Sequence, residues 1–318
     1  MKIVILDGFA ENPGDLSWAA LESVGELTVY DRTPPDLILP RMEGAVCVLT
    51  NKTMLTAATI EACPALRYIG LLSTGCNVVD IGAAAARNIP VCNIPGYSTA
   101  SVAQMTFALL LEICQNVGLH AESVRSGEWE TSPDFCYWKK PLIELDKKVM
   151  GIIGYGSIGR AVAKIARSFG MRVVFYNPTE KETDDPLCRQ VSLPDLFRLS
   201  DVVSLHCPLK EENRHLICRE SIENMKDGVI ILNTARGPLI HEADLAQALN
   251  TGKVYAAAVD VVSQEPILPD NPLLHAQNCF ITPHIAWAPK ESRQRLMNIA
   301  VENVRAFLRG EAQNVVNR

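Results

Sequence analysis

Residues 149–177 have the sequence VMGIIGYGSIGRAVAKIARSFGMRVVFYN, and this stretch decides the fold. A short apolar run leads into the hexapeptide GYGSIG at 154–159, after which small and apolar residues recur with helical spacing. A second run, 172–176, is rich in valine and aromatic residues, which favour strands. The stretch therefore predicts a strand, a glycine-rich turn, a helix and a second strand, which is one βαβ unit of a parallel sheet.

The glycine pattern G-x-G-x-x-G between a strand and a helix is typical of a dinucleotide-binding turn. Glycine is needed where the turn is tight, where the backbone approaches a pyrophosphate and where the helix packs closely on the strand. The N–H groups at the start of the helix would bind the phosphates. The alternative is an ordinary glycine-rich turn, but a strand, helix and second strand in register favour the dinucleotide. The residues predicted to hold it are Gly154, Gly156, Ser157, Ile158 and Gly159.

The residue after the second strand bears on the choice between NAD and NADP. An acid at this point binds the adenosine ribose and repels a 2′-phosphate. Asn177 stands there instead, followed by Pro178, Thr179 and Glu180, with Lys181 beyond. Asparagine can bond a ribose hydroxyl but does not repel a phosphate, and no arginine follows directly. We therefore predict NAD as the cofactor and leave NADP open.

The alternation of strand-like and helical segments extends in both directions from this unit. Residues 1–95 contain short β-branched runs such as KIVIL and VCVLT between helical patterns, and DVVSLHC, GVIILNTA, YAAAVDV and FITPH follow the glycine loop. Two parallel-sheet halves, and hence an α/β fold, are expected. Residues 101–119 form a nearly all-apolar helical stretch, which we expect a domain junction or a second subunit to cover. Residues 289–309 predict a final helix that stops at Gly310.

Length, charge and cysteine content exclude several classes of protein. The 318 residues suggest two domains whose cores need no disulfide or metal. The net charge of −6 opposes binding to nucleic acid. The ten cysteines lack metal-ligand spacing, so we expect reduced, mostly buried thiols and no metal. The start of the chain lacks signal-peptide features, and no apolar run approaches the length of a membrane span, so we expect a cytoplasmic protein with no membrane partner.

Three polar residues follow strand-like runs in the second half of the chain, where parallel sheets present ligand sites. Arg236 follows GVIILNTA, Glu265 follows AAAVDVVSQ, and His284 follows FITP. A 2-keto acid reductase requires a histidine that transfers a proton, a carboxylate that orients it and a guanidinium that holds the substrate carboxylate. Taken singly, an exposed Arg or Glu is mostly a solvated residue, and a lone His is more often structural than catalytic.

Several segments resemble the D-isomer-specific 2-hydroxyacid dehydrogenase family, and the resemblance covers essentially the whole chain. Besides the glycine loop, they are NTARG (233–237), AVDVVSQEP (258–266), NPLL (271–274) and TPHIAW (282–287). Within the family, other segments resemble the glycerate dehydrogenase/hydroxypyruvate reductase branch. These are LDG near the start, LTNKT (49–53), NIPGYSTASVAQ (93–104), SPDFCYWK (132–139) and HIAW.

The resemblance implies roles for the three polar residues. Arg236 would bind the substrate carboxylate and polarise its carbonyl, while protonated His284 would donate the proton as hydride leaves the nicotinamide. Glu265 would bond the far side of the imidazole and stabilise the imidazolium. Related formate dehydrogenases place glutamine where this chain has Glu265, so the acid argues for proton-coupled hydride transfer to a ketone.

Other positions are implied by the same resemblance. Towards the cofactor they are His206, Cys207 and Pro208 beside the adenine and ribose, Asp260 at the nicotinamide carboxamide, and Thr234 and Ala235 through backbone contacts. Towards the substrate they are Ser73, Thr74 and Gly75, whose backbone N–H groups would hold the carboxylate, together with Lys52 and Trp287. A plain turn at 73–75, a solvated Lys52 and a core Trp287 are the alternatives. Trp138 would reach a partner's active site in a dimer.

The resemblance also implies an architecture and an activity. The fold would be two doubly wound parallel-sheet domains, with a Rossmann cofactor domain (99–286) inserted into a flavodoxin-like substrate domain (1–98 and 287–318) and the active site in the cleft between them. The activity would be reduction of hydroxypyruvate to D-glycerate with NADH by a homodimer, with slower reduction of glyoxylate.

Two alternatives to that activity stay open. The first is another D-2-hydroxyacid dehydrogenase, of the D-lactate or 3-phosphoglycerate type. The 3-phosphoglycerate type is less favoured, because the chain ends at residue 318 without a regulatory extension. The second alternative belongs to a different class, a non-catalytic NADH-sensing protein similar to the co-repressors of this superfamily.

Overall fold

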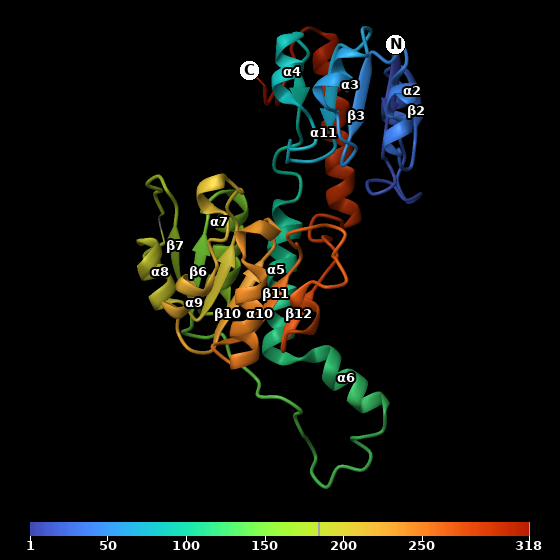
Figure 1. The fold of residues 1–318 in the computed structure, drawn as a ribbon. Helices are drawn as coiled ribbons and strands as arrows, with labels where there is room; N and C mark the ends of the chain where they lie inside the picture. The colour runs from blue at the N-terminus through green and yellow to red at the C-terminus, as the bar shows by residue number, and fades with distance from the viewer. Residues whose placement is uncertain (184, 318) are drawn as a thin grey trace. The chain divides into compact units, whose positions relative to one another are not determined.

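The computed structural model describes residues 1–183 and 185–317. The chain divides into two compact units, each with its own sheet (Figure 1). Unit 1 contains Met1–Ser98 and Trp287–Arg318, and unit 2 contains Thr99–Ala286, so unit 2 is inserted into the sequence of unit 1. Apolar clusters on both faces of each sheet confirm the predicted α/β class.

Unit 1 is built on a five-stranded sheet. Its strands are β1 (Lys2–Ile5), β2 (Glu26–Val29), β3 (Cys47–Thr50), β4 (Tyr68–Leu71) and β5 (Val91–Cys92). Its helices are α1 (Ala19–Glu22), η1 (Pro35–Leu37), α2 (Ile38–Met42), α3 (Ala57–Glu61), α4 (Ile81–Ala86) and α11 (Lys290–Leu308). The strands pair in parallel in the order β2-β1-β3-β4-β5. Helices α1 and α11 cover one face of the sheet, and α2, α3 and α4 cover the other.

Unit 2 is built on a seven-stranded sheet. Its strands are β6 (Val149–Ile153), β7 (Arg172–Tyr176), β8 (Cys188–Gln190), β9 (Val202–Leu205), β10 (Val229–Asn233), β11 (Val254–Val259) and β12 (Cys279–Ile281). Its helices are α5 (Thr99–Gln115), α6 (Val117–Arg125), α7 (Ser157–Ser168), α8 (Leu193–Leu199), η2 (Glu211–Asn213), α9 (Arg219–Glu223), η3 (Gly237–Leu239), α10 (Glu242–Thr251) and η4 (Pro272–His275). The strand order is β12-β11-β10-β9-β6-β7-β8, again parallel throughout.

Each strand order contains a topological switch point, where neighbouring strands are followed by connections that run in opposite directions. In unit 1 the chain leaves β1 towards β2 and leaves β3 towards β4, so the switch point lies between β1 and β3. In unit 2 it lies between β6 and β9 by the same argument. Ligands of open α/β sheets bind at such points, outside the carboxyl ends of the strands. A site is therefore expected in the loops after these four strands.

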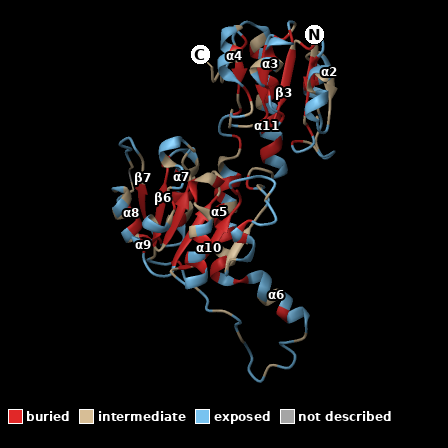
Figure 2. Cartoon of the chain, in the orientation of Figure 1, coloured by how far each residue is buried: buried red, intermediate tan, exposed pale blue. Residues whose placement is uncertain are grey.

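The strand sequences fit sheets that are covered on both faces. Every residue of β3, β4, β6, β9 and β10 is buried. In Figure 2, where buried residues are red, the strands of both sheets are mostly red. Alternation of apolar and polar residues is absent from such strands, because both faces of a parallel sheet meet helices. In unit 2, α5 and α7 pack on one face and α8, α9 and α10 on the other.

The long apolar helix differs from its prediction in two respects. Helix α5 ends at Gln115, because Asn116 takes a left-handed backbone with φ of 48° and a new helix, α6, follows. Its buried residues, such as Phe107 and Leu110, belong to the core of unit 2 itself. The core of unit 2 therefore covers these side chains, and coverage of the helix by a domain junction or a second subunit stays a prediction. Within the described residues no single helix could cross a membrane, and α5 with α6 meets the length and composition only as a pair bent by 56°.

A segment that we call the arm, residues 117–144, projects from unit 2 (Figure 1). It consists of α6 and an irregular stretch held to it by few bonds, among them one of 3.1 Å from the backbone N–H of Lys139 to Nε2 of His120. The aromatic side chains of Trp129, Phe135 and Trp138 are 51%, 88% and 66% exposed. The arm is thus the main place where unit 2 leaves large apolar side chains in water.

Two smaller expectations can be compared with the structure. All ten cysteines are free thiols, but only five are buried and Cys136, on the arm, is exposed, so the prediction of mostly buried thiols holds for half of them. The final helix, α11, runs over Lys290–Leu308, within one residue of the predicted bounds. Gly310 follows it with φ of 79°, the left-handed conformation in which glycine ends helices.

Candidate active site

The glycine loop after β6 has the backbone geometry that its sequence predicts. Gly154 has φ of 97°, and a Cβ there would lie 2.6 Å from the backbone of His206 and Cys207. A Cβ on Gly159 would lie 2.1 Å from the carbonyl oxygen of Gly154. These two glycines are therefore required by the packing of the protein itself.

Gly156 differs from the other two glycines in that its surroundings are open. It is exposed, and a Cβ there would meet nothing within 4 Å. It is also the N-cap of α7, and no side chain caps that helix. Free backbone N–H groups beside open space, at the positive end of a helix dipole, suit the pyrophosphate of a dinucleotide. The residues present therefore fit the cofactor that the motif implies, with Ser157 and Ile158 in the first turn of the helix.

The loop after β7 is bonded to the glycine loop through Asn177. Its Oδ1 accepts a hydrogen bond of 3.3 Å from the backbone N–H of Tyr155. Its Nδ2 donates to the carbonyl oxygen and to Oγ1 of Thr179, at 3.0 and 2.9 Å. The side chain thus fixes the local turn, and the predicted ribose ligand lies beside the predicted phosphate loop.

The loop after β9 brings His206, Cys207 and Pro208 to the same place. His206 contacts Oγ of Ser204 through Nε2 at 2.7 Å, while its Nδ1 is buried without a partner. Burial lowers the pKa of His206 to about 3, because a charged imidazole would lose its hydration. Burial likewise raises the pKa of the Cys207 thiol to about 11. Both side chains are therefore uncharged near neutral pH.

A turn braced by Asn233 carries Arg236 at the carboxyl end of β10. The Asn233 side chain is fully buried, accepts from the backbone N–H of Ala235 at 3.0 Å and donates to the carbonyl oxygen of Arg236 at 2.9 Å. Thr234 joins Thr106 of α5 through a hydroxyl contact of 3.1 Å. The half-buried guanidinium of Arg236 donates to the carbonyl oxygen of Ala235 at 2.6 Å.

The loops after β10 and β11 are in close contact. A Cβ on Gly237 would lie 1.9 Å from the carbonyl carbon of Val262, so only glycine fits there. The backbone N–H of Asp260 donates to the carbonyl oxygen of Asn233 at 2.9 Å. The residue after Arg236 therefore packs against the segment that leads to Glu265.

His284 and Glu265 form the central pair of the site. Nδ1 of His284 lies 2.7 Å from Oε2 of Glu265, and the other carboxylate oxygen accepts from the backbone N–H of Val262 at 3.4 Å. Because a carboxylate only accepts, the imidazole donates from Nδ1. The two side chains are 29% and 33% exposed, so the pair is reachable from solvent while its geometry is held.

Asp260 fixes the segment on either side of His284. Its carboxylate is buried and accepts from Oγ1 of Thr282 at 2.6 Å and from the backbone N–H groups of Ile285 and Ala286 at 2.9 and 2.8 Å. His284 itself has φ of 55°, a conformation that non-glycine residues adopt only when their surroundings hold it. In the structure the oxygens of Asp260 bond the histidine segment, and its implied contact with the nicotinamide stays a prediction.

The predicted substrate residues of unit 1 follow β3 and β4. Lys52 is exposed, and its backbone N–H donates to Oδ2 of Asp7 at 2.6 Å. The hydroxyls of Ser73 and Thr74 donate to the carbonyl oxygens of Gly75 and Ile94, each at 2.7 Å. None of the three backbone N–H groups at 73–75 donates a hydrogen bond within the described parts of the chain.

The two predicted tryptophans lie in different surroundings. Trp287 is half-buried, meets Tyr97 edge-on at 6.4 Å between ring centroids and packs into the apolar cluster beside α11. This packing favours the core alternative. Trp138 lies on the arm. Among the described residues, no hydrogen bond joins it to another predicted site residue.

Four residues that shape these loops were not predicted from the sequence. Asp7 and Asn233 end strand-like runs, so their position was a usable signal. Gly237 follows Arg236, but nothing in the sequence shows that another loop packs on it. Glu11 lies in the loop after β1, and an acid in a polar loop normally indicates solvation.

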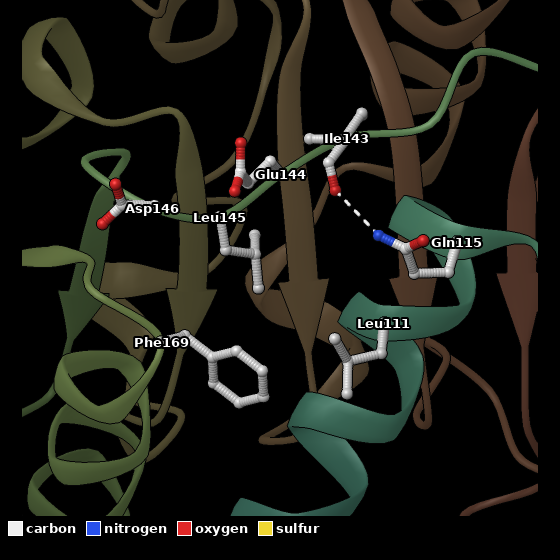
Figure 3. Close-up of a pocket in the computed structure, with 7 residues that line it drawn as sticks. All are labelled: Leu111, Gln115, Ile143, Glu144, Leu145, Asp146 and Phe169. Carbon is white, nitrogen blue, oxygen red and sulfur yellow. Dashed lines mark hydrogen bonds between the residues drawn. The ribbon is translucent and has the colours of Figure 1, made fainter.

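A cavity of about 430 Å³ lies elsewhere in unit 2, near the end of α5 (Figure 3). It is lined by Leu111, Gln115, Ile143, Glu144, Leu145, Asp146 and Phe169. None of these is a predicted site residue. Among the described residues there is also no group of three or more His, Cys, Asp or Glu side chains that could hold a metal ion.

Comparison with known proteins places this site in a family. Residues 107–286 match the NAD binding domain of the D-isomer specific 2-hydroxyacid dehydrogenases. A hydroxypyruvate reductase of Blautia hydrogenotrophica is 55% identical over the full length of both chains. A glycerate dehydrogenase of Methylorubrum extorquens is 38% identical over 92% of each chain.

Solved structures agree with these relatives. A D-2-hydroxyisocaproate dehydrogenase superposes with a TM-score of 0.87 and 25% identity over the whole of both chains. An acyclic imino acid reductase in complex with NADPH and D-Arg gives a TM-score of 0.86 and 28% identity over 99% of this chain and 100% of that one.

The chain belongs to the D-isomer specific 2-hydroxyacid dehydrogenase family. It is an oxidoreductase with an NAD(P)H-binding Rossmann domain inserted in the sequence of a second α/β domain, which confirms the expected family, class and fold.

Proposed function

We propose that this enzyme reduces hydroxypyruvate to D-glycerate, and glyoxylate more slowly. The observation that carries the proposal is the 2.7 Å contact between His284 and Glu265 beside the loop of Arg236. The full-length similarity to a hydroxypyruvate reductase at 55% identity supports the choice of substrate, since the glyoxylate reductases among the relatives are 35–36% identical.

The residues of the pair divide the proton chemistry between them. The bound reduced nicotinamide supplies hydride to the carbonyl carbon of the substrate. Nε2 of His284 donates its proton to the carbonyl oxygen, so that a hydroxyl forms and no charge is left on the product alcohol. Glu265, bonded to Nδ1, orients the ring and stabilises it while it is an imidazolium. In the oxidative direction the same Nε2 accepts the proton.

Binding of the substrate carboxylate is assigned to cations and free N–H groups. Arg236 offers a planar fork that matches a carboxylate, and we assign to it the polarisation of the neighbouring carbonyl as well. In unit 1, Lys52 and the unused backbone N–H groups at 73–75 are the proposed further ligands. Trp287 is not assigned to this set, because its half-buried ring packs against the apolar cluster beside α11.

For the cofactor we propose NAD(H) rather than NADP(H). Asn177 can bond a ribose hydroxyl, and the exposed residue Glu180 follows three positions later, where a 2′-phosphate would meet a negative charge. Among the remaining predicted residues, we assign the glycine loop to the pyrophosphate. His206, Cys207 and Pro208 are assigned to the adenosine. Thr234 and Ala235 are assigned to the nicotinamide half, and Asp260, which also bonds the segment of His284, is assigned to the nicotinamide carboxamide.

Two further proposals concern the state of the protein in the cell. Exposed aromatic residues on the arm support a homodimer in which the arm of one subunit packs on the other. Ten free thiols support a reducing compartment, and hence the cytoplasm.

The substrate proposal is tested by following NADH consumption with hydroxypyruvate, glyoxylate, pyruvate and 3-phosphohydroxypyruvate, and by repeating the best case with NADPH. We expect the highest kcat/KM with hydroxypyruvate and NADH. A higher value with pyruvate or 3-phosphohydroxypyruvate would assign the enzyme to another branch of the family. Absence of turnover with all four, while NADH still binds, would favour a sensing protein.

A further inference from the structure

The backbone of the loop after β3 is fixed by an acid that follows the neighbouring strand, β1. The carboxylate of Asp7, just beyond β1, accepts hydrogen bonds from three successive backbone N–H groups, those of Asn51, Lys52 and Thr53, at 2.8, 2.6 and 2.7 Å. Such an arrangement fixes the backbone of the loop. The loop also lies at the switch point of the unit 1 sheet, where a ligand is expected.

A second acid, Glu11, lies behind the same loop and has no exposed surface. Its Oε1 accepts a hydrogen bond from Nδ2 of Asn51. Its Oε2 is buried and has no partner among the described residues. A buried carboxyl with one oxygen unsatisfied is costly, and an apolar residue would fill the same space at a lower cost. Packing alone therefore does not account for an acid at position 11.

The backbone of Glu11 is fixed independently of its side chain. Nη1 of Arg293, on α11, donates to the carbonyl oxygen of Glu11 at 3.0 Å. The same guanidinium binds the carboxylate of Asp15 with two bonds of 2.7 Å. Because Arg293 anchors the backbone, the direction of the Glu11 side chain towards Asn51 is set by the fold.

We propose that Glu11 is a positioning residue for the substrate: it fixes the side chain of Asn51 and so holds Lys52 and its loop in place for the substrate carboxylate. The inference rests on the proposed function, in which Lys52 binds that carboxylate. Nothing in the proposal requires Glu11 to touch the substrate.

The charge of Glu11 gives the proposal a pH dependence. Burial raises the pKa of Glu11 to about 8, and the nearby Asp7 adds to the rise, while Lys52 and the hydrogen bond from Asn51 oppose it. The other charged groups beside it are Arg293 and Asp15, which neutralise each other. Near pH 7 the carboxyl is therefore uncharged. Above about pH 8 it adds a negative charge behind Lys52, which opposes an anionic substrate.

The test compares Glu11→Gln with Glu11→Leu. Glutamine keeps an oxygen for Asn51 but cannot ionise, whereas leucine leaves the Asn51 amide unpaired. At pH 7 we expect Glu11→Gln to keep the KM for hydroxypyruvate within about twofold, and Glu11→Leu to raise it about tenfold with a much smaller change in kcat. Between about pH 7 and pH 9, the KM of the parent should rise about threefold more than that of Glu11→Gln. The rest of the site is common to both enzymes, so its own pH dependence cancels in this ratio.

A readout without turnover separates this proposal from the proposed function. Amide hydrogen exchange at Asn51, Lys52 and Thr53 should be about tenfold faster in Glu11→Leu and near the parent's rate in Glu11→Gln. This result would support the positioning role even if the enzyme prefers another keto acid. Unchanged exchange and unchanged KM in both variants would overturn it.

A control variant separates positioning from general loss of stability. Arg87 clamps the carbonyl oxygens of Ile60 and Cys63 in the same unit, away from the loop. Arg87→Met should lower the unfolding temperature and leave the KM for hydroxypyruvate and its pH dependence unchanged. If Arg87→Met raises KM as much as Glu11→Leu does, the effect is one of stability and the proposal fails. Should Glu11→Leu not fold, the pH comparison with Glu11→Gln still decides.

Discussion

At the scale of single residues, the strongest feature of the site is that its proposed proton donor, His284, is held on two sides. Glu265 bonds the imidazole of His284, and Asp260 bonds the backbone just beyond it. The left-handed backbone at 284 is strained for a histidine, and it persists because these bonds hold the segment. Strain retained by buried bonds is typical of functional positions, which agrees with the proposed role.

The first prediction concerns this histidine. His284→Ala should lower kcat for hydroxypyruvate by a factor on the order of 100 to 10,000, because a positioned general acid contributes that much. NADH affinity, measured by fluorescence titration, should stay within about twofold, since His284 is not among the residues assigned to the cofactor. His275→Ala, at an exposed histidine of the same unit, is the matched control. Turnover near the parent's rate would show that another group donates the proton.

A second prediction follows from the buried imidazole of His206. Its pKa is about 3 in the folded protein and about 6.5 when unfolded, so the fold favours the neutral form. Its contribution to stability is complete above about pH 6.5 and is lost as the pH falls towards 3, at up to ~1.4 kcal/mol per pH unit.

Urea unfolding at several pH values from about 7 to 4 measures this effect. His206→Gln, which cannot ionise, should lose less stability than the parent over that range. His275→Gln should follow the parent, because that side chain is exposed. Equal acid sensitivity in the parent and in His206→Gln would mean that the ring is not buried in solution.

At the scale of secondary-structure elements, the sequence predicted the features that depend on a local residue pattern. It did not predict the features that depend on contacts between distant segments. The apolar runs of β6, β9 and β10 and the helix after the glycine loop were recognisable, because a buried strand and an amphipathic helix each leave a local signal. The end of α5 was not, since Asn116 interrupts the helix by its backbone conformation while the apolar pattern continues beyond it.

The candidate site divides in the same way. His284, Glu265 and Arg236 follow strand ends, and parallel strands bring such positions to one edge of the sheet, so their proximity was predictable. The packing of Gly237 on Val262 and the burial of Glu11 depend on which loops meet, and a single sequence carries no signal of that. Trp287 lies close to His284 in sequence, which suggested a substrate contact, and its half-buried ring packs against the apolar cluster beside α11.

A third prediction tests the contact between the loops after β10 and β11. Gly237→Ala would place a methyl group 1.9 Å from the carbonyl carbon of Val262, so one loop must move. We expect a loss of stability of about 1–3 kcal/mol, as for overpacked cores, together with at least a roughly tenfold fall in kcat/KM because Arg236 moves with its neighbour.

The matched control is Gly82→Ala in α4. There a Cβ would meet only Oδ1 of Asp80, at an ordinary 3.5 Å. Alanine is also the better helix former, so this variant should be as stable as the parent or slightly more so. A Gly237→Ala enzyme with parental activity and unfolding temperature would show that the two loops are not in tight contact.

At the scale of the whole molecule, each unit repeats one device, a parallel sheet whose switch point gathers polar loops. In unit 2 the glycine loop and the 206–208 loop meet there, and in unit 1 the loops of Asp7 and Lys52 do. The arm has no part in either sheet. Its exposed aromatic residues therefore need a separate explanation, and contact with a second copy of the chain is the one consistent with the proposed homodimer.

The last prediction tests that explanation by sedimentation equilibrium. The parent should sediment at twice the chain mass of 34.9 kDa. The double variant Phe135→Ser, Trp138→Ser removes the two most exposed aromatic side chains of the arm, and it should weaken the dimer about 100-fold or more, because buried aromatic anchors dominate the energy of interfaces. Leu187→Ser, at an apolar side chain that is 47% exposed elsewhere in unit 2, should leave the dimer intact. A parent enzyme that sediments as a monomer, or a double variant with the parent's dimer affinity, would remove the arm from the interface.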